Sequence, residues 1–97
     1  CVSLEVEVRE LPVLPGAREL AAAGDVTGGS RANRDYVGAG LVTQDICEED
    51  LALALDPQTS GGLLIALPEV DAERFLAVAS GSRVGRVLAG EARVALA

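Results

Sequence analysis

The sequence has no His, no Met, no Lys and no Trp, and only one Phe, one Tyr and two Cys among its 97 residues. Without His it cannot form a His-based catalytic triad, and two Cys alone do not supply the usual ligands of a zinc site. With so few aromatic residues, the core has to be built from Val, Leu, Ile and Ala. The absence of Met indicates that a leader was removed or that the chain is a piece of a longer protein, and we expect the second.

Positive charge is also scarce. The chain carries 8 basic residues, all of them Arg, against 15 Asp+Glu, which gives a formal net charge of -7. The arginines are scattered, so no basic cluster can neutralise a run of phosphates, and we expect no binding to nucleic acid. No apolar run approaches the ~18 residues of a membrane span, and the first residues show no signal-peptide pattern, so we expect no membrane partner.

The two cysteines, Cys1 and Cys47, do not indicate a disulfide framework, although a single bridge stays open at this point. A reducing cytoplasm is therefore the expected location. We do not expect Cys47 to be a nucleophile, because it has no His partner and the acidic residues at positions 45, 48, 49 and 50 raise the pKa of a nearby thiol.

In the first half of the chain, the alternation of apolar and polar side chains over residues 2–8 predicts a strand with one buried face. Pro15 is placed to begin a helix that runs to about Ala23, where Gly24 favours its end. Residues 25–40 are rich in Gly, Asn, Asp and Ser, so we expect a loop there, with at most a short helical turn at residues 31–36.

In the second half, three consecutive acids at residues 48–50 predict the start of a helix, which Asp56-Pro57 closes. The other predicted elements are a strand buried on both faces at residues 63–67, an amphipathic helix at 72–79 that Gly81 ends, and a hairpin of strands at 84–88 and 92–96. The length fits a single domain, residues 1–97. We expect an α+β fold in which helices pack on one face of a small mixed sheet.

The string Asp-Pro-Gln-Thr-Ser-Gly-Gly at residues 56–62 is the first candidate site. Its glycines permit positive φ, so that consecutive N–H groups can form an anion-binding nest, and its hydroxyls add donors. Asp56 could orient this loop or approach Mg²⁺ from outside. The string is not a Walker A loop, because no Lys follows the glycines. On composition alone, a simple turn into a strand is the better interpretation.

The string Gly-Gly-Ser-Arg-Ala-Asn-Arg at residues 28–34 is the second candidate site. Ser30 could cap a short helical turn, and the glycine pair would let the backbone approach a ligand. Arg31 or Arg34 could hold a phosphate. A solvated glycine-rich loop is again the plainer interpretation, but two such loops in one small domain favour a site.

Three stretches, taken in order, resemble the C-terminal domain of the selenophosphate synthetases (selenide, water dikinases), which are similar to aminoimidazole ribonucleotide synthetase. They lie at residues 14–24, 28–38 and 56–66, and the Asp-Pro-Gln-Thr-Ser-Gly-Gly string is the most specific of them. The resemblance covers the chain from about residue 11 to its end. The family more often has Thr at the position of Ser30 and often a basic residue at that of Ala32, so this loop does not supply two adjacent cations.

The resemblance implies a two-domain protein in which this domain covers the ATP and phosphate cleft of an N-terminal domain, which forms most of a homodimer contact. The implied reaction converts ATP, selenide and water into selenophosphate, AMP and phosphate with Mg²⁺. The catalytic Cys or selenocysteine, the catalytic Lys and the metal-binding Asp residues would all precede this chain, which would be inactive alone. The implied cleft residues are Asp56, Gln58, Thr59, Ser60, Gly61, Gly62, Gly28, Gly29, Ser30, Arg31 and Asn33.

Two other functions stay open. The chain could belong to another ATP-using member of the same superfamily, of the hydrogenase-maturation or thiamine-phosphate kinase type, although the complete string at residues 56–62 argues against it. It could also be a purely structural domain that supports a dimer, in which case both glycine pairs are architectural.

Overall fold

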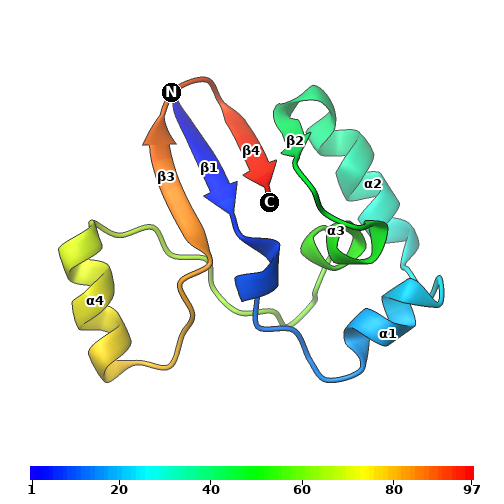
Figure 1. The fold of residues 1–97 in the computed structure, drawn as a ribbon, viewed down its shortest axis with the longest axis horizontal. Helices are drawn as coiled ribbons and strands as arrows, with labels where there is room; N and C mark the ends of the chain where they lie inside the picture. Colours follow the sequence, from blue (N-terminus) through cyan, green and yellow to red (C-terminus); the bar gives the residue numbers. More distant parts are fainter.

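The computed structural model describes every residue from 1 to 97 and shows a mixed sheet with α-helices beside it (Figure 1). The strands are β1 (Val2–Val6), β2 (Leu41–Thr43), β3 (Gly85–Ala89) and β4 (Arg93–Leu96). The α-helices are α1 (Ala17–Ala22), α2 (Gly28–Val37), α3 (Glu48–Ala54) and α4 (Glu69–Val78), and two 3-10 helices are η1 (Val8–Glu10) and η2 (Gly38–Gly40). The predicted α+β class with a mixed sheet is confirmed.

The strand order in the sheet is β2-β4-β1-β3. β1 pairs with β3 in antiparallel and with β4 in parallel orientation, and β2 extends the parallel side. The predicted hairpin is therefore wrong, because β1 lies between its two strands. The connection from β3 to β4 passes the start of β1, where Gly90 N donates to the carbonyl of Cys1 over 3.3 Å. Both edges of β1 are therefore hydrogen-bonded, one to β3 and the other to β4.

One face of the sheet, which we call the apolar face, carries Val and Leu side chains from three strands. Direct partners in a ladder point to the same side of a sheet. The register therefore places Leu4 beside Val87 and Val94, and Val6 beside Leu96.

The opposite face, which we call the polar face, carries an ion pair but also the apolar side chains of Leu88 and Val42. Glu5 is the ladder partner of Arg86, and Arg86 Nε donates to Glu5 Oε2 over 2.6 Å. Ser3 lies on this face as well, yet it is buried, contrary to the predicted alternation. Its burial follows from the β3–β4 connection, because Ser3 Oγ donates to the carbonyl of Glu91 over 2.8 Å.

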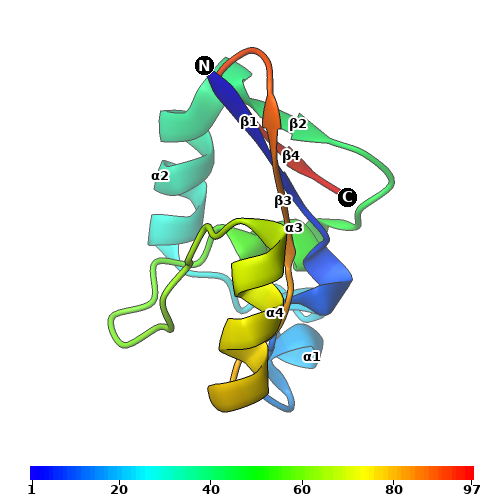
Figure 2. The ribbon, with the colours of Figure 1, turned by 90° about the vertical axis from the view of Figure 1, so that its left-hand side faces the viewer.

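The core is small. Three apolar side chains are fully buried, those of Val8 in η1, Leu51 in α3 and Leu96 in β4. Partly buried apolar residues surround them: Val6, Leu11, Leu41, Ile46, Ala54, Leu55 and Val94. The helix α3 thus covers the β4 and β2 part of the apolar face. In Figure 1, α1, α2 and α3 lie together on the β2 side, and α4 lies apart near β3; in the nearly edge-on view of Figure 2, α2 stands on one side of the sheet.

The largest difference from the sequence-based expectation is α2, which replaces a predicted loop with a ten-residue helix. The predicted cap is also wrong: Thr27 is the N-cap residue, and its Oγ1 accepts a hydrogen bond from Ser30 N over 3.3 Å. A capped N-terminus and contacts to α3 outweigh the low helix propensity of the two glycines in the first turn.

The predicted strand at residues 63–67 is also wrong. The segment forms no ladder, and the side chains of Leu63 and Leu64 are 89% and 73% exposed. An apolar run becomes a buried strand only where neighbouring strands accept its backbone groups, and residues 63–67 pair with none of the four strands. Sequence patterning also missed the short strand β2.

The remaining boundaries agree with the patterns within a few residues. The helix expected from Pro15 begins at Ala17, and Gly24, with φ of 92°, terminates it. The helices α3 and α4 begin at acidic residues, as helix N-termini favour. No helix of the structure has both the length and the apolar character that a bilayer crossing requires.

The small core yields a first prediction. Val8 is 1% exposed and Val2 is 54% exposed, so Val8→Ala leaves a cavity, whereas Val2→Ala removes atoms that already contact water. We expect Val8→Ala to lower the free energy of unfolding by about 1–3 kcal/mol and Val2→Ala by less than ~0.5 kcal/mol. Urea denaturation of the two variants measures this difference, and equal losses would contradict the assigned core.

Candidate functional site

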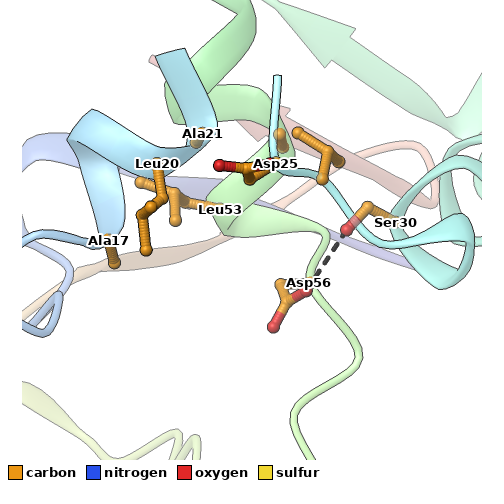
Figure 3. A pocket seen from close by; sticks show the side chains of 9 residues that line it. Ala17, Leu20, Ala21, Asp25, Ser30, Leu53 and Asp56 are labelled. Carbon is orange, nitrogen blue, oxygen red and sulfur yellow. Dashed lines mark hydrogen bonds between the residues drawn. The ribbon is translucent and has the colours of Figure 1, made fainter. Parts of the chain in front are cut away.

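The structure brings the two predicted site segments together. Asp56, directly after α3, faces the N-terminus of α2 (Figure 3). Its Oδ1 atom accepts hydrogen bonds from Thr27 Oγ1 over 3.2 Å and from Ser30 Oγ over 3.3 Å. The two hydroxyls also lie 3.2 Å from each other. The positive end of the α2 dipole and two hydroxyl groups therefore surround one carboxylate.

Two further contacts join the same segments. Asn33 Nδ2 donates to the carbonyl of Leu55 over 2.8 Å. A Cβ atom at Gly29 would lie 2.4 Å from Cγ of Pro57, so the proline ring packs directly on the α2 backbone and only glycine leaves room for it. Three consecutive residues, 55–57, are thus fixed to the first turns of α2.

The rest of the first candidate site, residues 58–62, is exposed. Neither Gly61 nor Gly62 has a positive φ, so the predicted nest built on that conformation does not form. Gly61 has a different role: a Cβ atom there would lie 2.7 Å from Oε1 and 3.2 Å from Cβ of Gln58. The loop folds back on its own glutamine and leaves the hydroxyls of Thr59 and Ser60 accessible.

A shallow hollow of about 180 Å³ lies between α1 and the joined segments (Figure 3). Apolar side chains of α1 and α3, among them Leu20 and Leu53, form most of its wall, and Asp25, Ser30 and Asp56 add polar atoms. Ligand pockets usually enclose about 300–1,000 Å³, so this hollow alone cannot enclose a nucleotide. It can only form one wall of a larger site.

Of the basic residues near this wall, Arg31 is exposed and forms no ion pair, whereas Arg34 binds Glu48 with an Nη1–Oε2 distance of 3.0 Å. Arg31 is thus the free cation on α2. The chain also gathers no group of three or more Cys, Asp or Glu residues suited to a metal ion. The chain therefore has no site that would hold Mg²⁺ by three or more of its own side chains.

A second, larger hollow of about 590 Å³ lies beside η1 and the start of α3, and sequence reasoning did not anticipate it. Cys47 and Asp50 line it together with three further acidic residues, Glu7, Glu10 and Asp45. Asp50 is buried, and its Oδ1 atom lies 2.6 Å from Arg18 Nη1. This ion pair joins α1 to α3 and gives the carboxylate a structural role.

Cys47 is free and exposed, and so is Cys1, so the structure has no disulfide. The backbone N–H of Asp50 lowers the pKa of the Cys47 thiol, but partial desolvation and the carboxylates of Asp50 and Glu49 oppose it, and together they raise the pKa above its ordinary value. The expectation that Cys47 is not an activated nucleophile agrees with this direction.

Thr27 is the residue of this arrangement that the sequence analysis missed. A hydroxyl residue three positions before Ser30, directly ahead of the helix, is the usual signal of an N-cap. The signal was not used because a loop was predicted over residues 25–40.

No family model matches the chain. Curated relatives do match it: selenide, water dikinase 2 of Peptoclostridium acidaminophilum is 35% identical over 93% of this chain, and selenide, water dikinase of Caldanaerobacter subterraneus is 40% identical over 76%. This chain is a relative of the selenide, water dikinases. It spans only 28% and 22% of the length of these two proteins, and 22% of the enzyme of Bordetella bronchiseptica, which is 40% identical. The predicted resemblance is confirmed, for a part of such proteins.

The contact between Gly29 and Pro57 yields a matched pair of variants. An added Cβ at Gly29 collides with the proline ring, whereas at Gly28 it meets open space. We expect Gly29→Ala to lower the free energy of unfolding by about 1–3 kcal/mol through overpacking, and Gly28→Ala to leave it unchanged or raise it by up to ~1 kcal/mol. Thermal unfolding monitored by circular dichroism measures the stability of both variants. Equal stability of the two would show that Pro57 does not pack on α2.

The raised pKa of Cys47 yields a third prediction. Less thiolate is present at a given pH, so iodoacetamide should alkylate Cys47 at pH 8 more slowly than it alkylates free cysteine. Glu49→Gln removes one carboxylate that raises the pKa and should speed the reaction. Peptide mass spectrometry follows Cys47 separately from Cys1, and alkylation of Cys47 faster than of free cysteine would contradict the assigned direction.

Proposed function

We propose that this chain is the C-terminal part of a selenide, water dikinase, which forms selenophosphate, AMP and phosphate from ATP, selenide and water. The observation that carries the proposal is the fixed position of residues 55–57 on α2. Asp56 lines the hollow, and the exposed residues 58–62 follow shortly after it in the chain. The relatives carry the name of this activity over matches of 72–93% of the chain.

In this proposal the chain supplies one wall of the phosphate cleft. The hydroxyls and N–H groups of Thr59, Ser60, Gly61 and Gly62 donate to phosphate oxygens, where they stabilise developing negative charge without a proton transfer. On the other rim, Gly28, Gly29, Ser30 and Asn33 hold the loop, and Arg31 adds a positive charge.

The other components come from outside the chain. The N-terminal part of the longer protein holds most of the ATP and the Mg²⁺, which neutralises phosphate charge, and supplies the catalytic residues. That protein is a cytoplasmic homodimer in this proposal, and the present chain is inactive alone.

Two alternative functions predict different experimental outcomes. A related ATP-using enzyme would release ADP without a requirement for selenide, and a structural domain would show no saturable response to phosphate, sulfate or Mg-ATP. The hydrogen bonds of Asp56 to Thr27 and Ser30 support a positioned loop, because they hold the residue that precedes the exposed Thr59 and Ser60.

The fourth prediction tests the reaction on the longer protein that carries this chain. Anaerobic ³¹P NMR should show AMP formation that depends on selenide and a new phosphorus signal coupled to selenium. Gly61→Ala, which pushes against Gln58, should lower kcat about tenfold or more by displacing the donors. The matched control is Gly40→Ala, because an added Cβ there meets only Val37 Cγ1, at 4.0 Å.

Formation of ADP irrespective of selenide would refute the dikinase assignment. Equal activity of Gly61→Ala and Gly40→Ala, with AMP still formed, would refute only the role of the loop. The two parts of the proposal can therefore fail separately.

A further inference from the structure

We propose that the open half of the apolar face is the docking surface of one helix from the N-terminal part of the longer protein. This surface consists of Val2, Leu4, Val87 and Ala89, which are neighbours in the ladder of β1 and β3. The inference rests on the proposed function only for the existence of that N-terminal part.

The surface lacks a cover within the chain. At the β4 and β2 end of the face, α3 buries Leu96, but no helix packs extensively against β1 or β3. Val2 and Val87 are accordingly 54% and 46% exposed. On the polar face, β1 and β3 carry the ion pair of Glu5 and Arg86 beside Leu88, which is 38% exposed, so the apolar face has the greater need of a cover.

The total surface of the chain also indicates missing contacts. The accessible area is 7176 Å², whereas a compact monomer of 9.9 kDa exposes roughly 5,200 Å² by the usual dependence of area on mass. The radius of gyration, 14.1 Å, likewise exceeds the roughly 12.5 Å of a compact domain of this length. The chain therefore exposes more surface than a self-contained domain does.

The dimensions of the surface fit one helix. Two strands about 4.8 Å apart and five residues long give a strip roughly 10 Å wide and 17 Å long. A helix is about 10 Å in diameter and covers 17 Å in roughly three turns. A stable interface between two separate proteins takes about 800 Å² per partner, several times the area of the strip, which argues against a second copy as the occupant.

A helix that is covalently tethered to the chain needs less interface area, because attachment raises its effective concentration. The N-terminus of the chain lies at the top of β1, next to β3 (Figure 1), so a segment joined to Cys1 arrives beside the strip. The two relatives first described extend beyond the matched part by about three-quarters of their length. The longer protein therefore has ample chain to form this helix.

The fifth prediction uses two neighbouring positions on β3. Val87→Cys places a thiol on the strip, and Leu88→Cys, at a site 38% exposed, places one on the polar face. Each variant is labelled with iodoacetamide in the 97-residue chain and in the longer protein, and peptide mass spectrometry reads the modified position itself. We expect the longer protein to slow labelling at position 87 at least tenfold and at position 88 less than twofold.

Equal labelling of position 87 in both proteins would overturn the proposal, and so would equal slowing at both positions, because the cover would then not be specific to the apolar face. If labelling of position 87 in the 97-residue chain becomes slower as the protein concentration rises, the strip is instead a contact between two copies of the chain. Val2→Cys, on the same strip, repeats the measurement if Val87→Cys does not fold. Labelling needs neither ATP nor selenide, so slow labelling without selenide-dependent turnover would refute the proposed function alone.

Discussion

The carboxylate of Asp56 at the N-terminus of α2 is the interaction that organises the candidate site. Two glycines in the first turn of α2 cost up to about 1 kcal/mol each relative to alanine. The Thr27 cap returns about 1 kcal/mol, and a carboxylate at the helix N-terminus returns roughly 0.3–1 kcal/mol. The hydroxyls of Thr27 and Ser30 bind that carboxylate directly. The helix and the position of the loop therefore stabilise each other, and neither is favoured strongly alone.

The glycines that weaken α2 are also what permits the contact. Only a residue without Cβ at position 29 leaves room for the ring of Pro57, and proline restricts the backbone at the point where α3 has just ended. Together with the hydrogen bonds of Asp56 and the one from Asn33 to the carbonyl of Leu55, this packing fixes three consecutive residues, 55–57. Residues that suggest flexibility in the sequence thus produce a closely packed junction.

This junction also shows which parts of the structure local sequence patterns can predict. Acidic first turns and apolar spacing were sufficient for α3 and α4, and alternation was sufficient for β1, because these signals are local. The helix α2 depends on Asp56, 26 residues after Ser30, and the position of β1 between β3 and β4 depends on residues at both ends of the chain. Pairing of that kind leaves no local signal, so α2 was taken as a loop and β3 and β4 as a hairpin. For the same reason the sequence named both site segments but not their contact, nor Thr27, which joins them.

Under the proposed function, electrostatics explains why such a junction needs a partner to act on phosphate. The chain has a formal net charge of -7 and no Lys, and the positive end of α2 is already occupied by Asp56. What the loop at residues 58–62 offers to an anion is dipoles alone, with Arg31 as the nearby free cation. A polyphosphate brought to this surface in isolation meets net repulsion, and dipoles outweigh it only where water is excluded and other cations share the charge. Residues outside the chain, or a metal ion held by them, have to provide those cations. In the proposed function, the loop therefore contributes the orientation of phosphate rather than most of its binding free energy.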